Sequence, residues 1–140
     1  MSQLEAIRES FARDRFATEA AEITIESVQP GEAVCIMPIL PKHLNARGTV
    51  MGGAIFTLAD FTAAVAANGY AEDTTITLHG DITYLNAAKG KTLIANATTI
   101  KQGRSAALHQ IEIRDDLGTL VAHATMNGFV LHSAPVVEKK

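Results

Sequence analysis

Apolar residues occupy almost every position from 54 to 67, which leaves this segment with almost no polar face. Gly52 and Gly53 come before the run, and Asn68 and Gly69 follow it, as they commonly do at the end of a helix. A helix that is apolar all round is buried, so the rest of the fold must surround it. Its length of about 25 Å suits a small domain and not a membrane span. The pattern therefore predicts a core helix.

Long strand-like runs follow this helix and fill most of the second half of the chain. They extend over 74–85, 92–102, 105–114 and 119–131, with turn residues between them. At about 3.3 Å per residue, ten or more residues form a strand of roughly 30 Å or more. Strands of this length allow a highly twisted sheet to curl around one buried helix.

Two shorter strands precede the central helix. Ile23 and Ile25 alternate with polar residues, and a turn at 29–32 leads into a second apolar segment at 34–37. Alternation on both sides of a Pro-Gly turn predicts a β-hairpin.

A short helix is expected at the start of the chain. Ser2 and Glu5 have the spacing of a capping box, and the amphipathic pattern behind them predicts a helix that ends near Phe16. The predicted order is β-β-α-β-β-β-β after this helix, which is an α+β domain with an antiparallel sheet wrapped around one central helix. We expect a single domain over 1–135 and a short flexible tail over 136–140.

Composition narrows the class of protein. A chain of 140 residues with 47% hydrophobic residues has enough apolar side chains for one core. The formal net charge of −3 provides no basic surface for nucleic acid. Cys35 is the only cysteine and no secretion signal or membrane anchor is evident, so we expect a cytoplasmic protein in a reducing compartment. The five histidines have no zinc-binding spacing, and we expect neither a metal nor a cofactor.

Asp60 is the one acid in the central helix. A buried carboxylate either finds hydrogen-bond donors or shifts its pKa upward and becomes neutral. Two interpretations stay open at this point. Asp60 fixes helix packing through Thr57 or a backbone N–H, or it belongs to an active site, where perturbed acids tend to occur.

A polar loop leads into the same helix and carries further candidate groups. Asn45 can both donate and accept hydrogen bonds, and the N–H groups of Gly52 and Gly53 are unpaired at the helix start. Together with the positive end of the helix dipole, such donors suit an oxyanion. His43 either braces this loop by hydrogen bonding or faces water. The glycines have a plainer alternative, which is close packing of the helix on the sheet.

The spacing of these groups constrains how they work together. Asp60 follows Gly52 by eight helical positions, or about 12 Å along the axis. The helix start and the acid of one chain therefore cannot both touch one small reacting group. If they cooperate, they do so between two subunits, and we expect a homodimer.

The loop and helix together carry a recognisable motif, His43-x-Asn45-x-x-Gly48-x-x-Met51-Gly52-Gly53, followed by Leu58-Ala59-Asp60. Further matching segments lie at 81–85, at Lys89-Gly90 and at 102–105. The motif resembles that of hotdog-fold acyl-CoA thioesterases of the PaaI-like, phenylacetate-pathway type, and the resemblance covers nearly everything after the first twenty residues.

The resemblance implies a fold, a reaction and a set of roles. Asp60 would be the nucleophile or general base, the Gly52 N–H would polarise the thioester carbonyl, and Asn45 would position water or substrate. Asp60 would face Asn45 and Gly52 of the partner subunit, which agrees with the distance argument. The substrate would be an acyl-CoA, and the assembly a homodimer that pairs into a tetramer as a dimer of dimers.

Four further residues are candidates for substrate binding. Met51 stands where the family usually has histidine, a residue that helps to hold the thioester carbonyl, and Gly53 lets a substrate approach the backbone. Thr77 is a candidate orienter of Asp60 or of water, or else an ordinary β-branched strand residue. Arg104 is a candidate partner for the phosphates of the cofactor portion, or else a solvated surface charge.

Three functions remain open from the sequence. Hydrolysis of an acyl-CoA thioester ranks first because the acid, the helix start and Asn45 are all present. A non-catalytic acyl-CoA binder or regulator ranks second, since Met51 replaces the histidine. A hydratase or dehydratase ranks last, because it needs a histidine and acid pair that Met51 removes.

Overall fold

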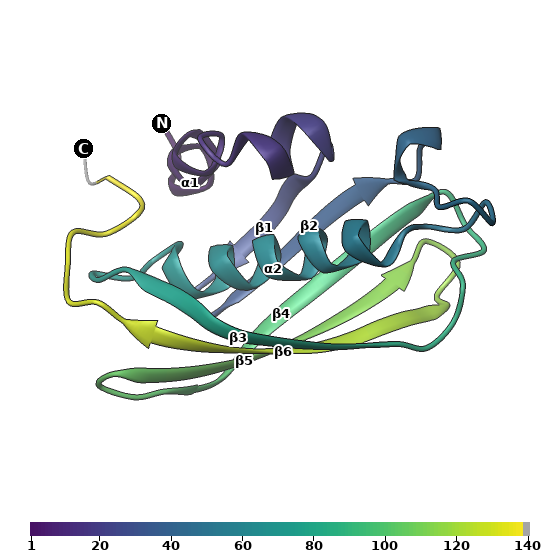
Figure 1. Ribbon diagram of the computed structural model, residues 1–140. Coiled ribbons are helices and arrows are strands. Elements are labelled where there is room, and N and C mark those ends of the chain that lie inside the picture. The colour runs from purple at the N-terminus through teal and green to yellow at the C-terminus, as the bar shows by residue number, and fades with distance from the viewer. Residues whose placement is uncertain (139–140) are drawn as a thin grey trace.

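The computed structural model describes residues 1–138 and contains one curved six-stranded antiparallel sheet with a helix lying on its concave face (Figure 1). The strand order is β1-β2-β4-β5-β6-β3. The strands are β1 Thr24–Gln29, β2 Glu32–Pro38, β3 Thr75–Tyr84, β4 Thr92–Gln102, β5 Ala106–Asp115 and β6 Leu120–Val130, and the helices are α1 Gln3–Phe11 and α2 Gly52–Asn68. The predicted arrangement of an antiparallel sheet around one central helix is confirmed.

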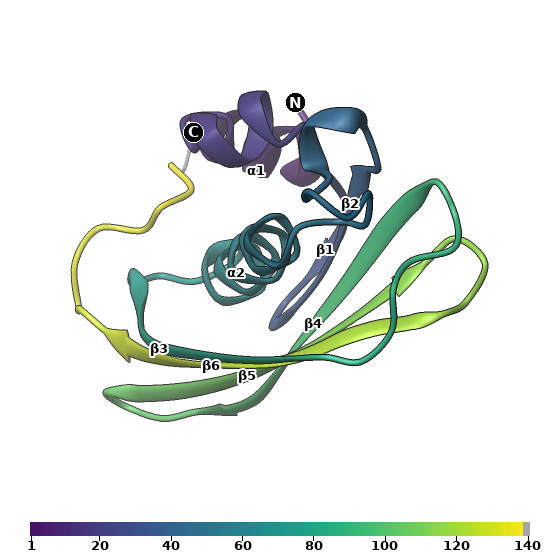
Figure 2. The same cartoon turned by 45° about the vertical axis from the view of Figure 1, so that its right-hand side comes forward.

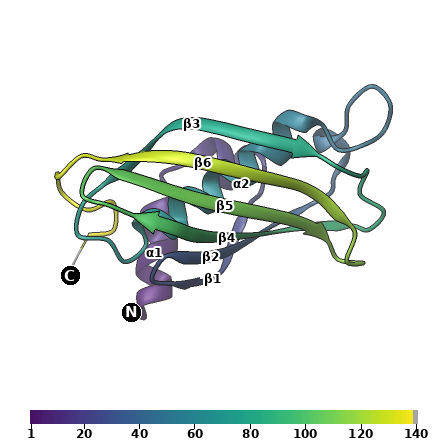
Figure 3. The same cartoon turned by 90° about the horizontal axis from the view of Figure 1, so that it is seen from below.

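The sheet curves because its long strands twist and carry bulges. The strand register shifts in β1 between Ile25 and Ser27, in β3 between Thr77 and His79, and in β4 near Thr99. Each extra residue increases the local twist and bends its strand. Figure 2 shows α2 nearly end-on, with the sheet below it and to one side, and Figure 3 shows the strand order on the outer face.

The core lies between α2 and the inner face of the sheet. Leu58, Ala59 and Val65 of the helix are fully buried. They pack over an inner sheet face rich in alanine, including Ala95 and Ala122. Small side chains on the sheet let the helix approach closely, and this close packing buries the apolar side chains on the sheet-facing side of α2.

One stripe of α2 is not covered, which corrects the expectation of a helix buried on every side. Gly53 and Asp60 are exposed, and Phe56 and Ala64 are only partly buried. These residues recur at helical spacing and face the side of the helix near β3, the last strand of the sheet. The sheet does not close over this side, so the predicted burial of Asp60 is wrong for the single chain.

The N-terminal segment lies over α2 on the side away from strands β3, β5 and β6 (Figure 2), and it differs in part from the prediction. The capping box between Ser2 and Glu5 is present, but α1 ends at Phe11 and not near Phe16. A separate π-helical turn follows at Phe16–Ala20. The Phe11 ring packs edge-on against Phe61 of α2 with ring centroids 5.7 Å apart, and this contact anchors the arm where the helix stops.

The segment after β6 returns to the N-terminal arm. Val137 is buried with 7% exposure and joins the core, and the Arg13 guanidinium donates to the Val136 carbonyl at 3.0 Å. These contacts hold residues 136–137 against the domain, because an apolar side chain there finds an uncovered surface; the single domain over 1–135 and the flexible tail over 136–140 stay predictions. Residues 139–140 of the expected tail lie outside the described residues.

Candidate active site

His43 holds the loop that leads into α2. Its Nδ1 accepts from the Leu40 N–H at 3.0 Å, so Nε2 carries the proton and donates to the Ala21 carbonyl at 2.8 Å. The ring is 4% exposed. Of the two interpretations that the sequence allowed, bracing of the loop is the one observed.

Asn45 organises the same loop with most of its side chain. Its Oδ1 accepts from the N–H groups of Arg47 and Thr49 at 2.9 and 3.2 Å, and its Nδ2 donates to the Thr49 hydroxyl at 3.0 Å. Gly48 has a φ of +83°, which closes this tight turn. One amide hydrogen of Asn45 has no acceptor among residues 1–138 and is available to a ligand.

The start of α2 presents free backbone donors. Met51 is the N-cap, its side chain caps no N–H group, and its carbonyl accepts from Ala54 and Ile55 at 3.0 and 3.2 Å. Within the described part of the chain, the N–H groups of Gly52 and Gly53 have no acceptor. These donors and the helix dipole form an anion-binding end.

A cavity of about 330 Å³ adjoins this helix start. Asn45, Gly52, Tyr84 and Asn86 are among the residues that line it. The Tyr84 hydroxyl donates to the Gly52 carbonyl at 2.8 Å. The structure thus brings Asn45 and Gly52 together as predicted, and it adds Tyr84, which the sequence marked only as part of a strand segment.

Asp60 lies on the exposed stripe of α2, against the edge strand. Partial burial raises the pKa of its carboxyl, as does the like charge of Asp14 in the N-terminal segment, while the nearby Thr77 side chain of β3 acts to lower it. Thr77 thus lies close enough to Asp60 to affect its pKa, and its role as an orienter of Asp60 or of water stays a prediction. Asp60 does not line the cavity beside Gly52, so one chain keeps the acid and the helix start apart.

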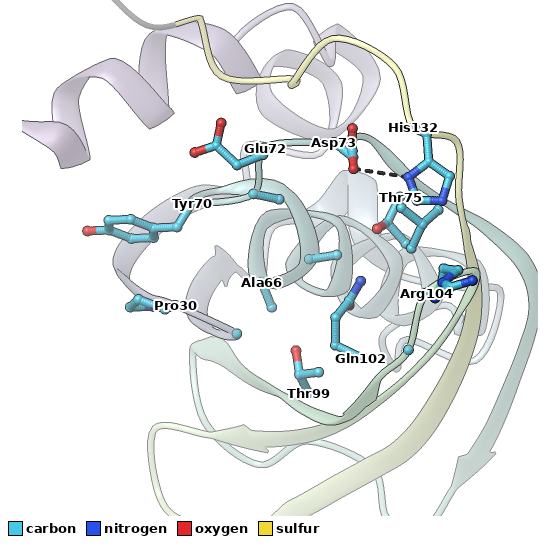
Figure 4. Close-up of a pocket in the computed structure, with 15 residues that line it drawn as sticks. Pro30, Ala66, Tyr70, Glu72, Asp73, Thr75, Thr99, Gln102, Arg104 and His132 are labelled. Carbon is cyan, nitrogen blue, oxygen red and sulfur yellow. Dashed lines mark hydrogen bonds and ion pairs between the residues drawn. The ribbon is translucent and has the colours of Figure 1, made fainter.

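A second cavity, of about 470 Å³, lies under the other end of α2 (Figure 4). Thr99 and Gln102 of β4 point toward the helix end, and His132 pairs with Asp73 at 3.2 Å at the margin. Arg104 lines this cavity and has no ion-pair partner among the described residues. Within one chain, then, Arg104 is far from the Asn45 and Gly52 site.

Two observations bear on metals and membranes. Among residues 1–138, no group of three or more histidine, cysteine, aspartate or glutamate side chains is placed to hold a metal ion. No helix in that same range is long and apolar enough to cross a bilayer.

Comparison with known proteins decides the family. Residues 47–122, more than half of the chain, match the thioesterase superfamily. The chain belongs to the thioesterase superfamily. The matched segment of this thioesterase begins in the Asn45 loop and includes α2 with Asp60, β3 with Thr77, and the turn that carries Arg104.

Individual relatives agree with this membership. The chain is similar to human acyl-coenzyme A thioesterase 13, with 30% identity over 127 residues that cover 84% of this chain and 86% of the relative. It is also similar to the structure of a hypothetical thioesterase with coenzyme A from Streptococcus pneumoniae, with 26% identity, a TM-score of 0.79, and coverage of 89% and 98% of the two chains.

The fold is shared with a further solved structure. The Escherichia coli PaaI protein of the phenylacetic acid degradation operon superposes with a TM-score of 0.84 and 24% identity, and 95% of this chain and 99% of that chain are covered. The resemblance to PaaI-like hotdog thioesterases that the sequence motif indicated is confirmed. This thioesterase has the hotdog fold.

Proposed function

We propose that this chain is an acyl-CoA thioesterase that hydrolyses a thioester to a free acid and coenzyme A. The family fixes thioester hydrolysis as the class of reaction. The observation that carries the proposal is the set of unpaired N–H groups at Gly52 and Gly53, beside Asn45 in a cavity. Asp60, whose pKa is raised by partial burial and by the charge of Asp14, lies near Thr77 on the open stripe of the same helix.

The site is completed by a second copy of the chain. Of the two sheet edges, β1 is covered by α1, whose Arg8 donates to the Ile25 carbonyl at 2.6 and 2.9 Å. The β3 edge is uncovered and exposes Ile76 at 40% and Leu78 at 66%. An apolar free edge is a ready surface for pairing with an identical strand.

Pairing of two β3 edges about a two-fold axis sets the two α2 helices side by side and antiparallel. The exposed stripe with Asp60 then faces the partner's helix, and the start of that helix comes toward it. Along one helix, Gly52 and Asp60 are about 12 Å apart, which is eight residues at about 1.5 Å each. In the dimer, Asp60 instead lies near Gly52 of the partner's helix. Two such dimers meeting through the outer sheet face, where Phe129 is 42% exposed, make the predicted dimer of dimers.

The reaction places each group in a defined step. The thioester oxygen accepts from the Gly52 N–H, while the amide hydrogen left free on Asn45 holds water or substrate. In the general-base route, the partner's Asp60 takes a proton from water as the water oxygen bonds to the carbonyl carbon. The carbon–sulfur bond then breaks, and the thiolate of coenzyme A receives that proton.

A covalent route uses the same groups. The Asp60 carboxylate bonds to the carbonyl carbon, the thiolate leaves and takes a proton from solvent, and water then hydrolyses the mixed anhydride. Label found in the Asp60 carboxylate after a single turnover in oxygen-18 water establishes the covalent route, because water that attacks the aspartyl carbonyl of the anhydride leaves its oxygen there. The raised pKa of Asp60 favours the base role, since a base works best with a pKa closer to the working pH.

Substrate binding involves the remaining candidates. The Met51 side chain lies over the helix start, with its methyl carbon 2.8 Å from where a Cβ on Gly53 would be, so the two residues together shape the approach to the free N–H groups. Arg104 offers a cation for a phosphate of coenzyme A. A cytoplasmic location stays the prediction from the sequence; the one cysteine, Cys35, is a buried free thiol whose pKa is raised by burial to about 12.

A non-catalytic acyl-CoA binder is the second candidate, and Met51 is the observation that favours it. A thioether cannot replace the hydrogen bonds of a histidine at the thioester carbonyl. Thiol release from acyl-CoA, measured for the wild type, Asp60→Asn and the control Asp81→Asn, tests the two functions. Turnover that collapses only in Asp60→Asn supports the enzyme; binding of acyl-CoA without turnover in any of the three supports the binder.

A further inference from the structure

Tyr84 is the last residue of β3, and it meets the first residue of α2 across 32 positions of sequence. Its hydroxyl donates to the Gly52 carbonyl at 2.8 Å. That carbonyl belongs to the same peptide group as the Gly53 N–H. A hydrogen bond on the oxygen of a peptide fixes the plane of the group and polarises its N–H, which becomes a better donor.

The ring of Tyr84 also explains why position 52 is glycine. A Cβ built on Gly52 would lie 3.0 Å from Cζ and Oη of Tyr84 and 3.4 Å from Cε2. The φ of Gly52 is not in the left-handed region, so backbone conformation does not require glycine there. The first turn of α2 rests directly on the tyrosine ring, so a side chain at position 52 would require the ring or the turn to move by a few tenths of an ångström.

The surroundings of Tyr84 suit a group that donates and does not ionise. The residue lines the cavity with Asn45 and is half-exposed, and partial burial raises the pKa of its phenol. The hydroxyl therefore keeps its proton at neutral and mildly alkaline pH. The hydroxyl donates to the Gly52 carbonyl and not toward the open cavity.

We infer that Tyr84 is a positioning residue for thioester hydrolysis: it orients the Gly52 N–H that holds the developing oxyanion, together with the neighbouring Gly53 N–H. The ring fixes the Cα of Gly52, and the hydroxyl fixes the peptide between Gly52 and Gly53. This inference rests on the proposed function, because it assigns Tyr84 a task within the same site. It acts through the backbone donors and makes no contact with the reacting atoms.

Two substitutions separate the hydroxyl from the ring. Tyr84→Phe removes the hydrogen bond and keeps the ring, so kcat should fall by roughly tenfold. This is less than the roughly 10²- to 10³-fold fall in kcat that loss of a whole oxyanion donor causes. KM should stay within about twofold, because ground-state binding is not the target. Tyr70→Phe is the matched control, since Tyr70 is 44% exposed at the far end of α2.

A rescue experiment tests the ring contact. Gly52→Ala keeps the backbone N–H but places a methyl group 3.0 Å from the Tyr84 ring, so the ring and the first turn must move apart, and kcat should fall by about 100-fold. In the double variant Gly52→Ala with Tyr84→Leu, the obstacle is smaller, and at least tenfold of the lost kcat should return. If the double variant is no better than Gly52→Ala alone, the ring does not set the position of Gly52.

The deciding measurement combines kinetics with the amide NMR signal of Gly53. We expect Tyr84→Phe to lower kcat, to leave KM and the melting temperature nearly unchanged, and to move the Gly53 amide proton upfield, with no such change in Tyr70→Phe. Wild-type kcat with an unmoved Gly53 signal would overturn the inference. If the wild type itself releases no thiol, the proposed function fails on that result alone, and the Gly53 amide signal in Tyr84→Phe still decides whether Tyr84 sets these donors.

Discussion

Leu78 offers the sharpest test of the proposed dimer, because it lies on the free β3 edge with 66% of its surface exposed. The substitution Leu78→Asp removes the apolar contact and puts a carboxylate where the two β3 strands would pair. In an isologous dimer each substitution acts twice, once from each subunit.

The size of the effect follows from the exposed area. Full burial of a leucine side chain is worth about 1.5–3 kcal/mol, so the two-thirds that Leu78 leaves exposed corresponds to roughly 1–2 kcal/mol per subunit. Two copies give roughly 2–4 kcal/mol, which weakens the dimer Kd by about 30- to 1,000-fold. The two buried carboxylates repel each other and move the result toward the upper end.

Sedimentation velocity over a range of protein concentrations measures this change. Leu117→Asp is the matched control, because Leu117 is 69% exposed in the turn between β5 and β6 and receives the same charge away from β3. Thiol release by Leu78→Asp should fall at concentrations where the protein becomes monomeric. A Leu78→Asp protein that dimerises as tightly as the control, or a monomer with full activity, would refute the reasoning.

Three further predictions concern pH and stability. The acid limb of kcat/KM should have its midpoint above the usual carboxyl pKa, because the pKa of Asp60 is raised. Asp14→Asn should lower that midpoint, because it removes a like charge near Asp60. An unchanged pH–rate profile in Asp14→Asn would show that Asp14 does not raise the pKa of Asp60. Burial acts to raise the pKa of Asp115, but hydrogen bonds from four backbone N–H groups hold this pKa at about 2. The ionised carboxylate therefore stabilises the folded protein above about pH 4, and this stabilisation is lost as the pH falls toward 2. Asp115→Asn should therefore lower the melting temperature at pH 7, with a gap to the wild type that narrows on acidification in a calorimetric series. His43→Leu should cost roughly 2–4 kcal/mol in urea unfolding, because two buried backbone groups lose their partner.

The fold followed from the sequence where the deciding interactions are local. The apolar run after Gly52 and the four long strand segments predicted α2 and strands β3 to β6, because hydrophobic period and turn residues depend on near neighbours. The break in the N-terminal helix was not predictable in this way. It occurs where Phe11 packs on Phe61, a contact between segments 50 residues apart.

The site was predicted in its residues more than in its arrangement. Asn45 and Gly52 are close in sequence and meet at one cavity, as the loop pattern indicated. Asp60 is exposed because β3 is the edge strand and no further strand covers this side of α2. The strand order depends on the whole sheet, so it cannot be predicted from the residues of the helix. The contact of Tyr84 with Gly52 likewise joins a strand end to a helix start, and Arg104 lies at the far end of α2 because of where β4 ends.

The central claim is that each active site takes Asp60 from one subunit and Asn45 with Gly52 from the other. Mixing of inactive Asp60→Asn and Asn45→Ala proteins, after reversible dissociation, tests this directly by thiol release. Random re-pairing makes half of the dimers mixed, and each mixed dimer has one intact site out of two. The account predicts recovery of about a quarter of wild-type activity. No recovery in a preparation shown to contain mixed dimers would contradict it, because the site would then lie within one chain.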